Sequence, residues 1–467
     1  MTAIRAVAVL AAALLAAGCA ARPPRAPLPA LAVPARLAGV TTADSAPAVA
    51  DRWWTAFGDP QLDALVDEAL AGSPSVDEAA ARLGAAAAVA KVARSGRLPQ
   101  ATFDASLDRE RLSETGLYPP PYNGATVNLG QLGVDLSYEV DLTGRIRAAV
   151  AAGDAGVAAA AADLAAARIG LAAAVARAYL ELGHNGSERA TLREAAVRRG
   201  ELLALTEQRA RAGLDTLLEV EEARASVAAV DADLAENAEQ EALLRNQLAA
   251  LAGKGPGRGA DLAAPAAQLP QTIVVPATLP ANLVGRRADV AAERARVAVA
   301  AAEVKVAETA FYPNLNLGAL LGVQSIELGS LLSAGARVWD VGPALSLPLF
   351  TAGRLRGELE GRDAEYRAAV ARYNATVLGA YHEVADAAAS LRALDREQLA
   401  SDAALRALGH AFELARGRYR AGLNNYVTVL IAEDKLLAQR RIAVALDARR
   451  AELAVALFRA LGGGFTS

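Results

Sequence analysis

The chain has 467 residues, a formal net charge of −4 and 54% hydrophobic residues, among which alanine is the commonest, whereas aromatic residues make up only 4%. This balance excludes the basic surface that a nucleic-acid partner requires, and it favours long helices in close contact over a thick aromatic core. The single cysteine, Cys19, excludes an intramolecular disulfide.

Residues 1–18 are typical of a processing signal, because their apolar run over 6–17 is too short to span a membrane. The run ends at Ala16-Ala17-Gly18-Cys19, which resembles a bacterial lipoprotein signal, although Ala16 stands where such signals usually carry Leu. We therefore expect a covalent lipid on Cys19 and no other cofactor. In such signals an Asp directly after the lipidated Cys resembles an inner-membrane retention signal. Because this chain has Ala20 there, the outer membrane is the favoured location. An ordinary secretory signal is the alternative.

The mature chain begins with a Pro-rich tether over 19–52, which should be extended and without a core. A first repeat follows over 53–253. It contains a helix over 73–97, strands over about 101–112 and 128–141, and a long helical hairpin whose tip lies at 212–215. A linker over 254–280 leads to a second repeat of the same plan over 281–462. Its first helix covers 283–310, its strands about 313–324 and 338–350, and its hairpin tip 421–424. A short tail over 463–467 ends the chain.

The two repeats are related by a constant offset of 209 residues, which pairs three glycines with three others: Gly144 with Gly353, Gly213 with Gly422, and Gly253 with Gly462. A period this long indicates a duplicated half-molecule rather than a solenoid. Each long helix spans 69 residues, or about 100 Å, and each returning helix is about 57 Å long. We expect Gly213 and Gly422 to end the long helices in left-handed caps, with Asp215 and Asn424 capping the helices that return.

The predicted strands alternate apolar and polar residues, as in Leu132, Val134 and Leu136 against Gly133, Asp135 and Ser137. Period two with one polar face is the pattern of a membrane barrel with a wet interior, and a half-buried soluble sheet is the alternative. No stretch after residue 20 reads as a membrane helix, so strands would have to cross the membrane. Four strands cannot close around a channel, and this predicts a homo-oligomer.

Several motifs resemble those of the TolC-type outer-membrane efflux duct family, and in particular its lipidated OprM/NodT-like branch. They are Trp53-Trp54-Thr55-Ala56-Phe57-Gly58-Asp59-Pro60, Leu283-Val284-Gly285-Arg286-Arg287-Ala288-Asp289-Val290-Ala291-Ala292-Glu293-Arg294, Ala310-Phe311-Tyr312-Pro313-Asn314-Leu315 and Arg418-Tyr419-Arg420-Ala421-Gly422-Leu423. One departure is Ala288, which stands where the family usually has Pro.

This resemblance implies a mainly α fold with a membrane β-barrel portion, in which a homotrimer builds one twelve-stranded barrel from four strands per chain. A helical tunnel then extends into the periplasm, where an adaptor (membrane fusion) protein docks. An inner-membrane pump, expected to be of the proton-driven resistance-nodulation-division type, supplies cargo. The implied protein is lipid-anchored in the outer membrane and spans it. Its function would be passive export of drugs or toxic compounds, as in multidrug resistance.

The resemblance also assigns sites at the two tips. It places adaptor contact on Ala212, Gly213, Leu214, Ala421, Gly422 and Leu423, and gate positions on Glu219, Tyr419, Asn424, Thr428 and Ile431. The family's basic and acidic gate residues match uncharged side chains at Asn424, Thr428 and Ile431, so a carboxylate ring from the second tip is in doubt. Glu219 has an alternative role as an acid at a helix start.

Two further acids, Glu383 and Asp386, lie three residues apart on one face of the second long helix. They are candidates for a cation-attracting ring in the lumen, or else for ion pairs with neighbouring arginines. The three histidines are far apart and no nucleophile, metal or phosphate-loop motif is present, so we expect no enzyme activity. A lipid-anchored periplasmic scaffold and the exit duct of a type I protein secretion system are the alternative functions.

Overall fold

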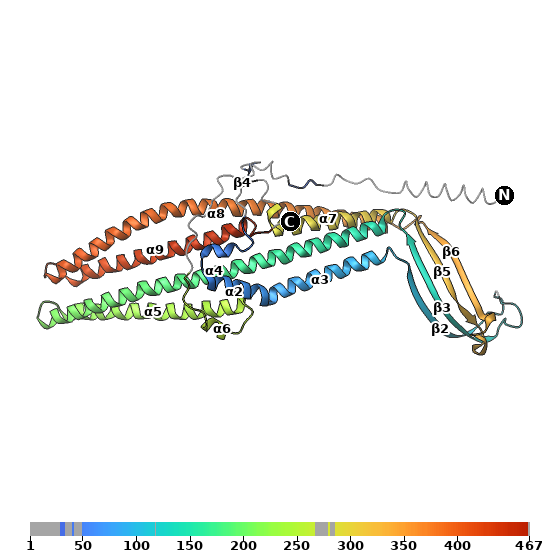
Figure 1. The fold of residues 1–467 in the computed structure, drawn as a ribbon, viewed down its shortest axis with the longest axis horizontal. Coiled ribbons are helices and arrows are strands. Elements are labelled where there is room, and N and C mark those ends of the chain that lie inside the picture. The colour runs from blue at the N-terminus through green and yellow to red at the C-terminus, as the bar shows by residue number, and fades with distance from the viewer. Residues whose placement is uncertain are drawn as a thin grey trace. The chain divides into compact units, whose positions relative to one another are not determined.

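The computed structural model describes residues 29–32, 40–41, 49–116, 118–266, 279–280 and 285–465, so the expected lipid site at Cys19 lies outside the described residues. The chain divides into two units (Figure 1). The first contains Arg82–Ala160 and Ala292–Tyr373, and the second contains Ala32–Ala81, Ala161–Ala291 and Asn374–Ser467. The long helices begin in the first unit and end in the second.

The first unit holds a four-stranded antiparallel sheet with the order β2-β3-β5-β6. The strands are β2 (Gln100–Arg111), β3 (Thr126–Val140), β5 (Asn314–Ser325) and β6 (Arg337–Ser346). The last strand was expected to reach residue 350 but ends at Ser346, and Pro348 just beyond it has no N–H to continue the ladder.

The register brings most of the apolar residues of the four strands onto one face, whereas Leu320 lies on the other face, paired with Asp135 and Asp340. In one row across the sheet, Phe103 pairs with Val134, Val134 with Leu321, and Leu321 with Trp339. These side chains are exposed in the single chain, with Phe103 at 67% and Trp339 at 74%. A soluble sheet would cover such a face, because a contiguous exposed apolar surface is unfavourable in water. The sheet therefore presents an apolar surface that a membrane can cover, with polar residues behind it.

Helices make up most of the remaining described chain. Their bounds are α2 (Pro60–Gly72), α3 (Pro74–Ser95), α4 (Arg145–Arg211), α5 (Leu217–Leu251), α6 (Gly257–Ala260), α7 (Ala288–Thr309), α8 (Arg354–Arg420) and α9 (Tyr426–Ala460). Short elements complete it, namely β1 (Val40–Thr41) parallel to β4 (Leu279–Pro280) and the 3-10 turns Trp53–Phe57, Leu328–Ser330 and Ala334–Ala336.

The two repeats are equal in helix length, since α4 and α8 have 67 residues each and α5 and α9 have 35 each. Against the sequence-based expectation, α4 contains an 18-residue window with a mean hydropathy of 1.5, which is apolar enough for a membrane span. The helix is rich in alanine, a residue that raises hydropathy while it favours helix in any setting. Length and composition alone therefore do not make α4 a membrane helix.

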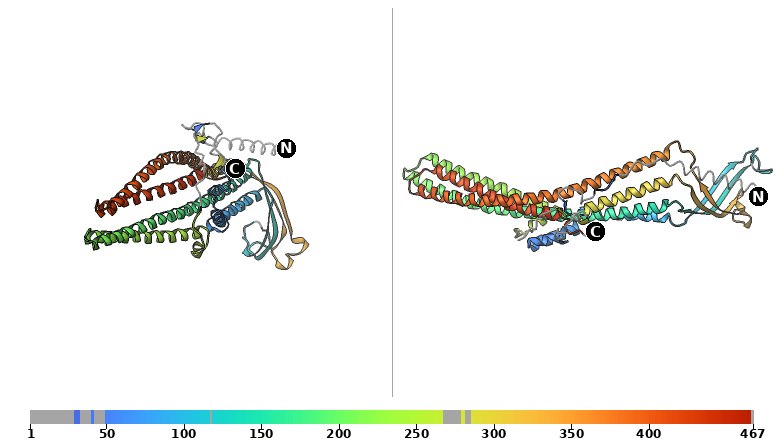
Figure 2. Two further views of the ribbon diagram at one scale, coloured as in Figure 1. Left: turned by 60° about the vertical axis from the view of Figure 1, so that its left-hand side comes forward. Right: turned by 90° about the horizontal axis from the view of Figure 1, so that it is seen from above.

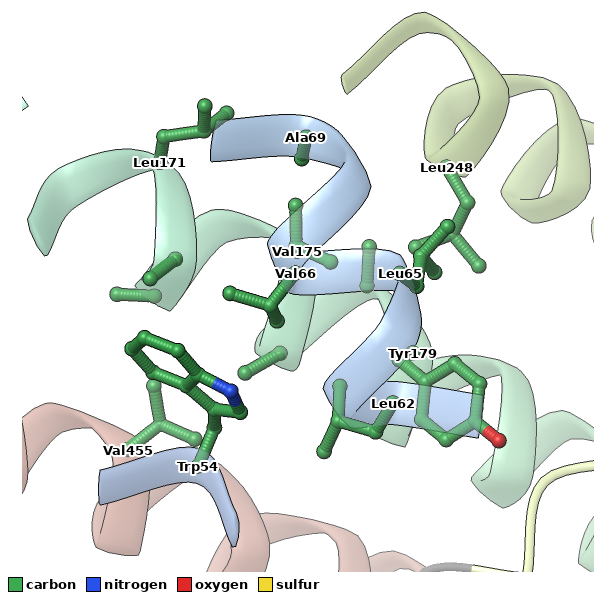
Figure 3. Packing of buried hydrophobic residues seen from close by; sticks show 14 of the residues in the cluster. Trp54, Leu62, Leu65, Val66, Ala69, Leu171, Val175, Tyr179, Leu248 and Val455 are labelled. Atoms are coloured by element: carbon green, nitrogen blue, oxygen red, sulfur yellow. The ribbon is translucent and has the colours of Figure 1, made fainter. Parts of the chain in front are cut away.

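The core of the second unit lies where α2 packs on α4, α5 and α9 (Figure 3). Leu62, Leu65 and Val66 of α2 are fully buried there with Val175 of α4 and Leu248 of α5. The opening motif contributes its aromatic rings to this core. Trp53 stacks on Phe458 of α9 with 5.5 Å between ring centroids. The segment that precedes α2 and the last turn region of α9 are thereby packed into one cluster.

The three repeated glycine pairs all adopt the left-handed conformation, with φ between +71° and +107°. After α4, Gly213 N–H bonds to Ala210 O and Leu214 N–H to Arg209 O, and the same two bonds recur at Gly422 and Leu423. This pair of bonds defines a Schellman motif, in which glycine carries no steric penalty. The offset seen in the sequence is thus a repetition of helix stops at two of the pairs, whereas Gly144 and Gly353 directly precede α4 and α8.

We expect Gly462→Ala to destabilise the second unit strongly. A Cβ at Gly462 would lie 1.9 Å from the carbonyl oxygen of Arg286, in addition to the strain of its φ of +107°. Chemical unfolding followed by circular dichroism should show a loss of at least about 2 kcal/mol. The control is Gly213→Ala, where nothing lies within 4 Å of the added atom and only about 1 kcal/mol should be lost. Equal losses in the two variants would contradict the clash.

Candidate functional site at the tips of the two helical hairpins

The two hairpin tips are exposed turns. Residues 212–214 and 421–423 are exposed, and each turn presents one leucine, Leu214 at 65% and Leu423 at 68%. Ala212, Gly213, Ala421 and Gly422 leave the backbone of the turns accessible beside these leucines. Each tip can therefore offer a small apolar knob to a partner.

The caps of the returning helices lie one residue later than expected. Thr216, not Asp215, is the N-cap of α5, and Asn425, not Asn424, is the N-cap of α9. The prediction of Asp215 was wrong because its carboxylate is taken by two side chains described below. Asn424 instead donates to the carbonyl oxygen of Ala415 at 3.3 Å.

Asp215 is the centre of a cluster that joins the first tip to the second hairpin. Arg209 donates to it through two nitrogens at 2.9 and 3.1 Å, and the hydroxyl of Tyr419 donates to it at 2.5 Å. Arg209 also donates to the backbone carbonyl of Tyr419 at 3.1 Å, and its guanidinium lies 4.5 Å from the centre of the tyrosine ring. Thr206 Oγ1 lies 3.0 Å from the Tyr419 hydroxyl. We name these four residues the tip clamp.

The tip clamp is strong because its charges are shielded from water. The Asp215 side chain is 7% exposed, and the Arg209 side chain 13%. Burial alone would raise the pKa of Asp215, but the hydrogen bonds from Arg209 and Tyr419 outweigh it and hold the pKa below its ordinary value. Burial, followed by the bond to Asp215, raises the pKa of Tyr419 to about 12. The aspartate is therefore charged and the tyrosine neutral at any ordinary pH.

The tip clamp has no counterpart in which the two repeats exchange roles. At the offset of 209 residues, Thr206 corresponds to Ala415, Asp215 to Asn424 and Tyr419 to Ala210, while Arg209 alone is repeated, as Arg418. The second tip therefore keeps only the arginine and cannot build an equivalent clamp. Sequence reasoning marked Tyr419 but missed Thr206 and Arg209; the repetition of Arg209 as Arg418 was an available signal.

The remaining gate candidates lie at the starts of α5 and α9. Glu219 forms a capping box with Thr216. The hydrogen bonds that its carboxylate accepts from the hydroxyl and the backbone N–H of Thr216 lower the pKa of Glu219. Thr428 donates its hydroxyl hydrogen to Asn425 at 2.8 Å, and Ile431 is 51% exposed. These contacts give Glu219 a structural role at the helix start.

The two proposed lumen acids differ in their surroundings. Glu383 accepts hydrogen bonds from Arg287 at 2.8 Å and from Arg459 at 3.3 Å, so its charge is largely compensated within the chain. Asp386 is exposed. Over the described ranges, no three His, Cys, Asp or Glu side chains are grouped closely enough to hold a metal ion.

A family model described as outer membrane efflux protein matches residues 65–254 and 279–463, which are the two repeats. Among curated proteins, the chain is 38% identical to the fusaric acid resistance protein FusA of Burkholderia cepacia over 78% of this chain and 70% of that one. It is 31% identical to the outer membrane protein OprJ of Pseudomonas aeruginosa over 88% and 86% of the two chains.

Solved structures give the same result. The outer membrane protein VceC of Vibrio cholerae aligns with a TM-score of 0.85 and 38% identity, covering 90% of this chain and all of that one. The outer-membrane channel OprN aligns with a TM-score of 0.82 and 30% identity over 95% and 98% of the two chains. The likeness thus includes the sheet as well as the hairpins.

Proposed function

The chain belongs to the outer membrane efflux protein family and is an outer-membrane exit channel of a tripartite efflux system, and we propose that its cargo is small toxic organic compounds, including drugs. Its homologues are channel proteins rather than enzymes, and they work with a periplasmic adaptor and an inner-membrane pump. Each chain supplies four strands to a trimeric barrel, which continues as a helical tunnel in the periplasm.

The observation that carries this function is the exposed apolar face of the sheet. It crosses all four strands in register, and its largest side chains, Phe103 and Trp339, are mostly exposed in the single chain. A periplasmic scaffold would have no use for this surface. In a barrel the same face meets lipid, and the polar face lines the water-filled interior.

The proposal about cargo rests on the relatives. One is named for fusaric acid resistance, and another, in Escherichia coli, is a multidrug resistance outer membrane protein that is 30% identical over 89% of this chain. We infer that a proton-driven pump of the resistance-nodulation-division type supplies such molecules to this chain as well. A duct for secreted proteins is less well supported, because the relatives' names refer to small molecules.

We also propose that Cys19 is acylated, so that its lipid and the barrel hold the same chain in the outer membrane. The barrel would remain a membrane anchor without the lipid, because its strands span the membrane. Removing the lipid by Cys19→Ala should then leave the trimer embedded.

The adaptor is proposed to bind the hairpin tips. Leu214 and Leu423 are the exposed apolar side chains of the two turns, and the tip clamp fixes the first turn against the second hairpin. The adaptor would then meet two turns in fixed register. The constriction is assigned to the helix starts beside them, where Glu219, Thr428 and Ile431 lie.

The duct itself is tested by conductance in planar lipid bilayers. We expect the purified trimer to insert and to show a low resting conductance that rises when its purified adaptor is added, because the adaptor spreads the tips. The adaptor added to a bilayer without the trimer is the control. Failure to insert, or no conductance at any adaptor concentration, would contradict the assignment as a channel.

Adaptor binding should depend on the tip clamp and on pH. Because the pKa of Asp215 is lowered in the clamp, the stabilisation is present above the ordinary pKa of about 4 and is lost as the pH falls through the lowered value. Asp215→Ala should weaken adaptor binding about tenfold at pH 7, in line with the loss of a charged hydrogen bond. Surface plasmon resonance with immobilised trimer measures both effects.

The matched control is Asn424→Ala, which alters the repeat counterpart of Asp215 and should change the affinity by less than about twofold. Within the described residues its side chain makes one hydrogen bond, which is long. The affinity ratio of wild type to Asp215→Ala should fall towards one as the pH is lowered below about 4. A ratio that stays constant with pH, or an equal effect of both substitutions, would show that the clamp does not position the tips.

A further inference from the structure

The charged residues of the four-stranded sheet are divided between its two faces by the sign of their charge. Residues that pair directly across strands share a face, and successive residues along a strand lie on opposite faces. The face behind the apolar row carries all the carboxylates of the four strands, which are Asp104, Asp108, Glu110, Asp135, Glu139 and Asp340. The face that carries the apolar row has all their basic residues, which are Arg109, Arg111 and Arg337. These strands therefore present cations, and no acid, on the side that meets lipid.

The three arginines lie at the same end of the sheet. Figure 2 shows in both views that helices continue from one end of the strands and that loops join the strands at the other end. Arg109 and Arg111 are near the end of β2, and Arg337 is the first residue of β6, so all three are at the loop end. Because the helical tunnel extends into the periplasm, the loop end faces the cell exterior. We call it the outer end.

The lipid-facing side of the sheet differs between its outer and periplasmic ends. At the periplasmic end the last lipid-facing residues of the four strands are apolar, namely Ala101, Val140, Leu315 and Leu345. At the outer end the corresponding residues are polar or cationic, namely Arg111, Thr126, Ser325 and Arg337. An arginine on the lipid face of a barrel costs little free energy only near the membrane surface. The cations are therefore matched to the headgroups of the outer leaflet.

The chain itself compensates these positive charges only weakly. Arg111 pairs with Glu114 at 3.0 Å, but the two side chains are 69% and 70% exposed, and such a surface pair contributes little. Among the described residues, no carboxylate forms an ion pair with Arg109 or Arg337, and both arginines are exposed. The acids next to Arg109 in the sequence lie on the opposite face of the strand. The arginines are therefore available to an anion from outside the chain.

Assembly of the barrel gathers the arginines into clusters. Arg109 and Arg111 are on β2 and Arg337 is on β6, and these are the two edge strands of the sheet. Closure of the trimeric barrel pairs β6 of one copy with β2 of the next. We call each such pairing a barrel seam. Since all the outer ends lie on one side of the membrane, cations from two copies meet at each barrel seam. Neighbouring like charges destabilise a sheet, and an anion bound between them removes the repulsion.

We propose that Arg109 and Arg111 of one copy and Arg337 of the next bind the phosphate groups of lipopolysaccharide at each barrel seam. This glycolipid forms the outer leaflet of bacterial outer membranes, and its lipid A headgroup carries phosphates on a glucosamine disaccharide. Arginine binds phosphate through two parallel hydrogen bonds. Arg109 and Arg111 lie about 7 Å apart along one face, so one headgroup can reach both. Trp339, on the same face and 74% exposed, is two residues from Arg337 and suits the border between headgroups and acyl chains.

Three lipids test the site in the assembled protein. Full-length trimer in detergent is titrated with bisphosphorylated lipid A, with enzymatically dephosphorylated lipid A and with phosphatidylglycerol, and native mass spectrometry counts the bound molecules. We expect bisphosphorylated lipid A to bind at least about tenfold more tightly than each of the other two, because charge-assisted hydrogen bonds are lost without its phosphates. Equal binding of the two forms of lipid A would overturn the phosphate site. Equal binding of phosphatidylglycerol would overturn lipopolysaccharide as its ligand.

The variant Arg109→Gln/Arg111→Gln/Arg337→Gln should lose the preference for the bisphosphorylated form. Lysine at the same three positions should retain part of it, because the charge remains while the paired hydrogen bonds of the guanidinium are lost. A preference that survives in the glutamine variant would overturn the assignment of these arginines.

The matched control is Arg97→Gln/Arg354→Gln/Arg356→Gln, which removes three exposed arginines beside the periplasmic end of the sheet. It changes the net charge of the chain by the same amount and should keep the preference. An equal loss in both triple variants would show general attraction between opposite charges and would overturn the site.

Thermal dissociation of the trimer tests the position of the site between copies. A ligand that binds only the assembled form stabilises it, so bisphosphorylated lipid A should raise the dissociation temperature on semi-native gels by at least about 5 °C. Dephosphorylated lipid A should not, and the glutamine variant should not respond to either form. Tight binding without such a rise would overturn the location at the barrel seam.

Two single variants apply if the glutamine variant does not form a trimer. Arg109→Gln and Arg337→Gln alter opposite sides of the barrel seam, and each should weaken the preference for the bisphosphorylated form at least about threefold, in line with one weakened charged contact. An unchanged preference in both would overturn the site. None of these measurements uses conductance or the adaptor, so their outcome is independent of the proposed cargo and gate.

Discussion

The two unpaired edges of the sheet are the constraint on which the rest of the structure depends. In the described residues, β2 and β6 each pair with a neighbour on one side only, and the apolar face between them suits lipid. Lipid offers no hydrogen bonds, so each unpaired backbone group would cost several kcal/mol there. Closure with the edges of other copies removes this cost. A barrel closed by several copies is therefore a requirement of the four-strand sheet, and a single chain is not a stable membrane unit.

Assembly of several chains also accounts for the equal helix lengths of the two repeats. Three chains with two hairpins each form a ring of six similar arms, so the two repeats must agree in helix length and in the turns that end the helices. They are free to differ in side chains. The side chains do differ between the repeats at the tip clamp and at the buried ion pair of Arg199 with Glu433. Removing one partner of such a buried pair typically lowers the free energy of unfolding by about 3–5 kcal/mol. Pseudo-symmetric arms thus have unlike contacts on their two sides.

Much of the fold could be predicted from the sequence, because backbone chemistry is local. Glycine at the end of a helical stretch favours a left-handed stop, and alternation at period two favours a strand with two unlike faces. The side-chain contacts at the tips were harder. Asp215 has the sequence context of a helix cap, and its bond to Tyr419, 204 residues away, follows only from the approach of the two hairpins. The pairing of Arg199 with Glu433 could not be predicted from the local sequence either. Each residue looks like an ordinary charged residue of a helix surface, and only the packing of the helices buries the two and brings them together.

Amide hydrogen exchange in lipid bilayers tests the closure of the sheet most directly. If neighbouring copies pair the edges, the amides of β2 and β6 should be as protected as those of β3 and β5, which are paired on both sides within one chain. The exchange of each strand can be followed by mass spectrometry of the trimer in bilayers. Equal protection of all four strands is the expected result. Rapid exchange confined to every second amide of β2 and β6 would show open edges and would contradict the barrel.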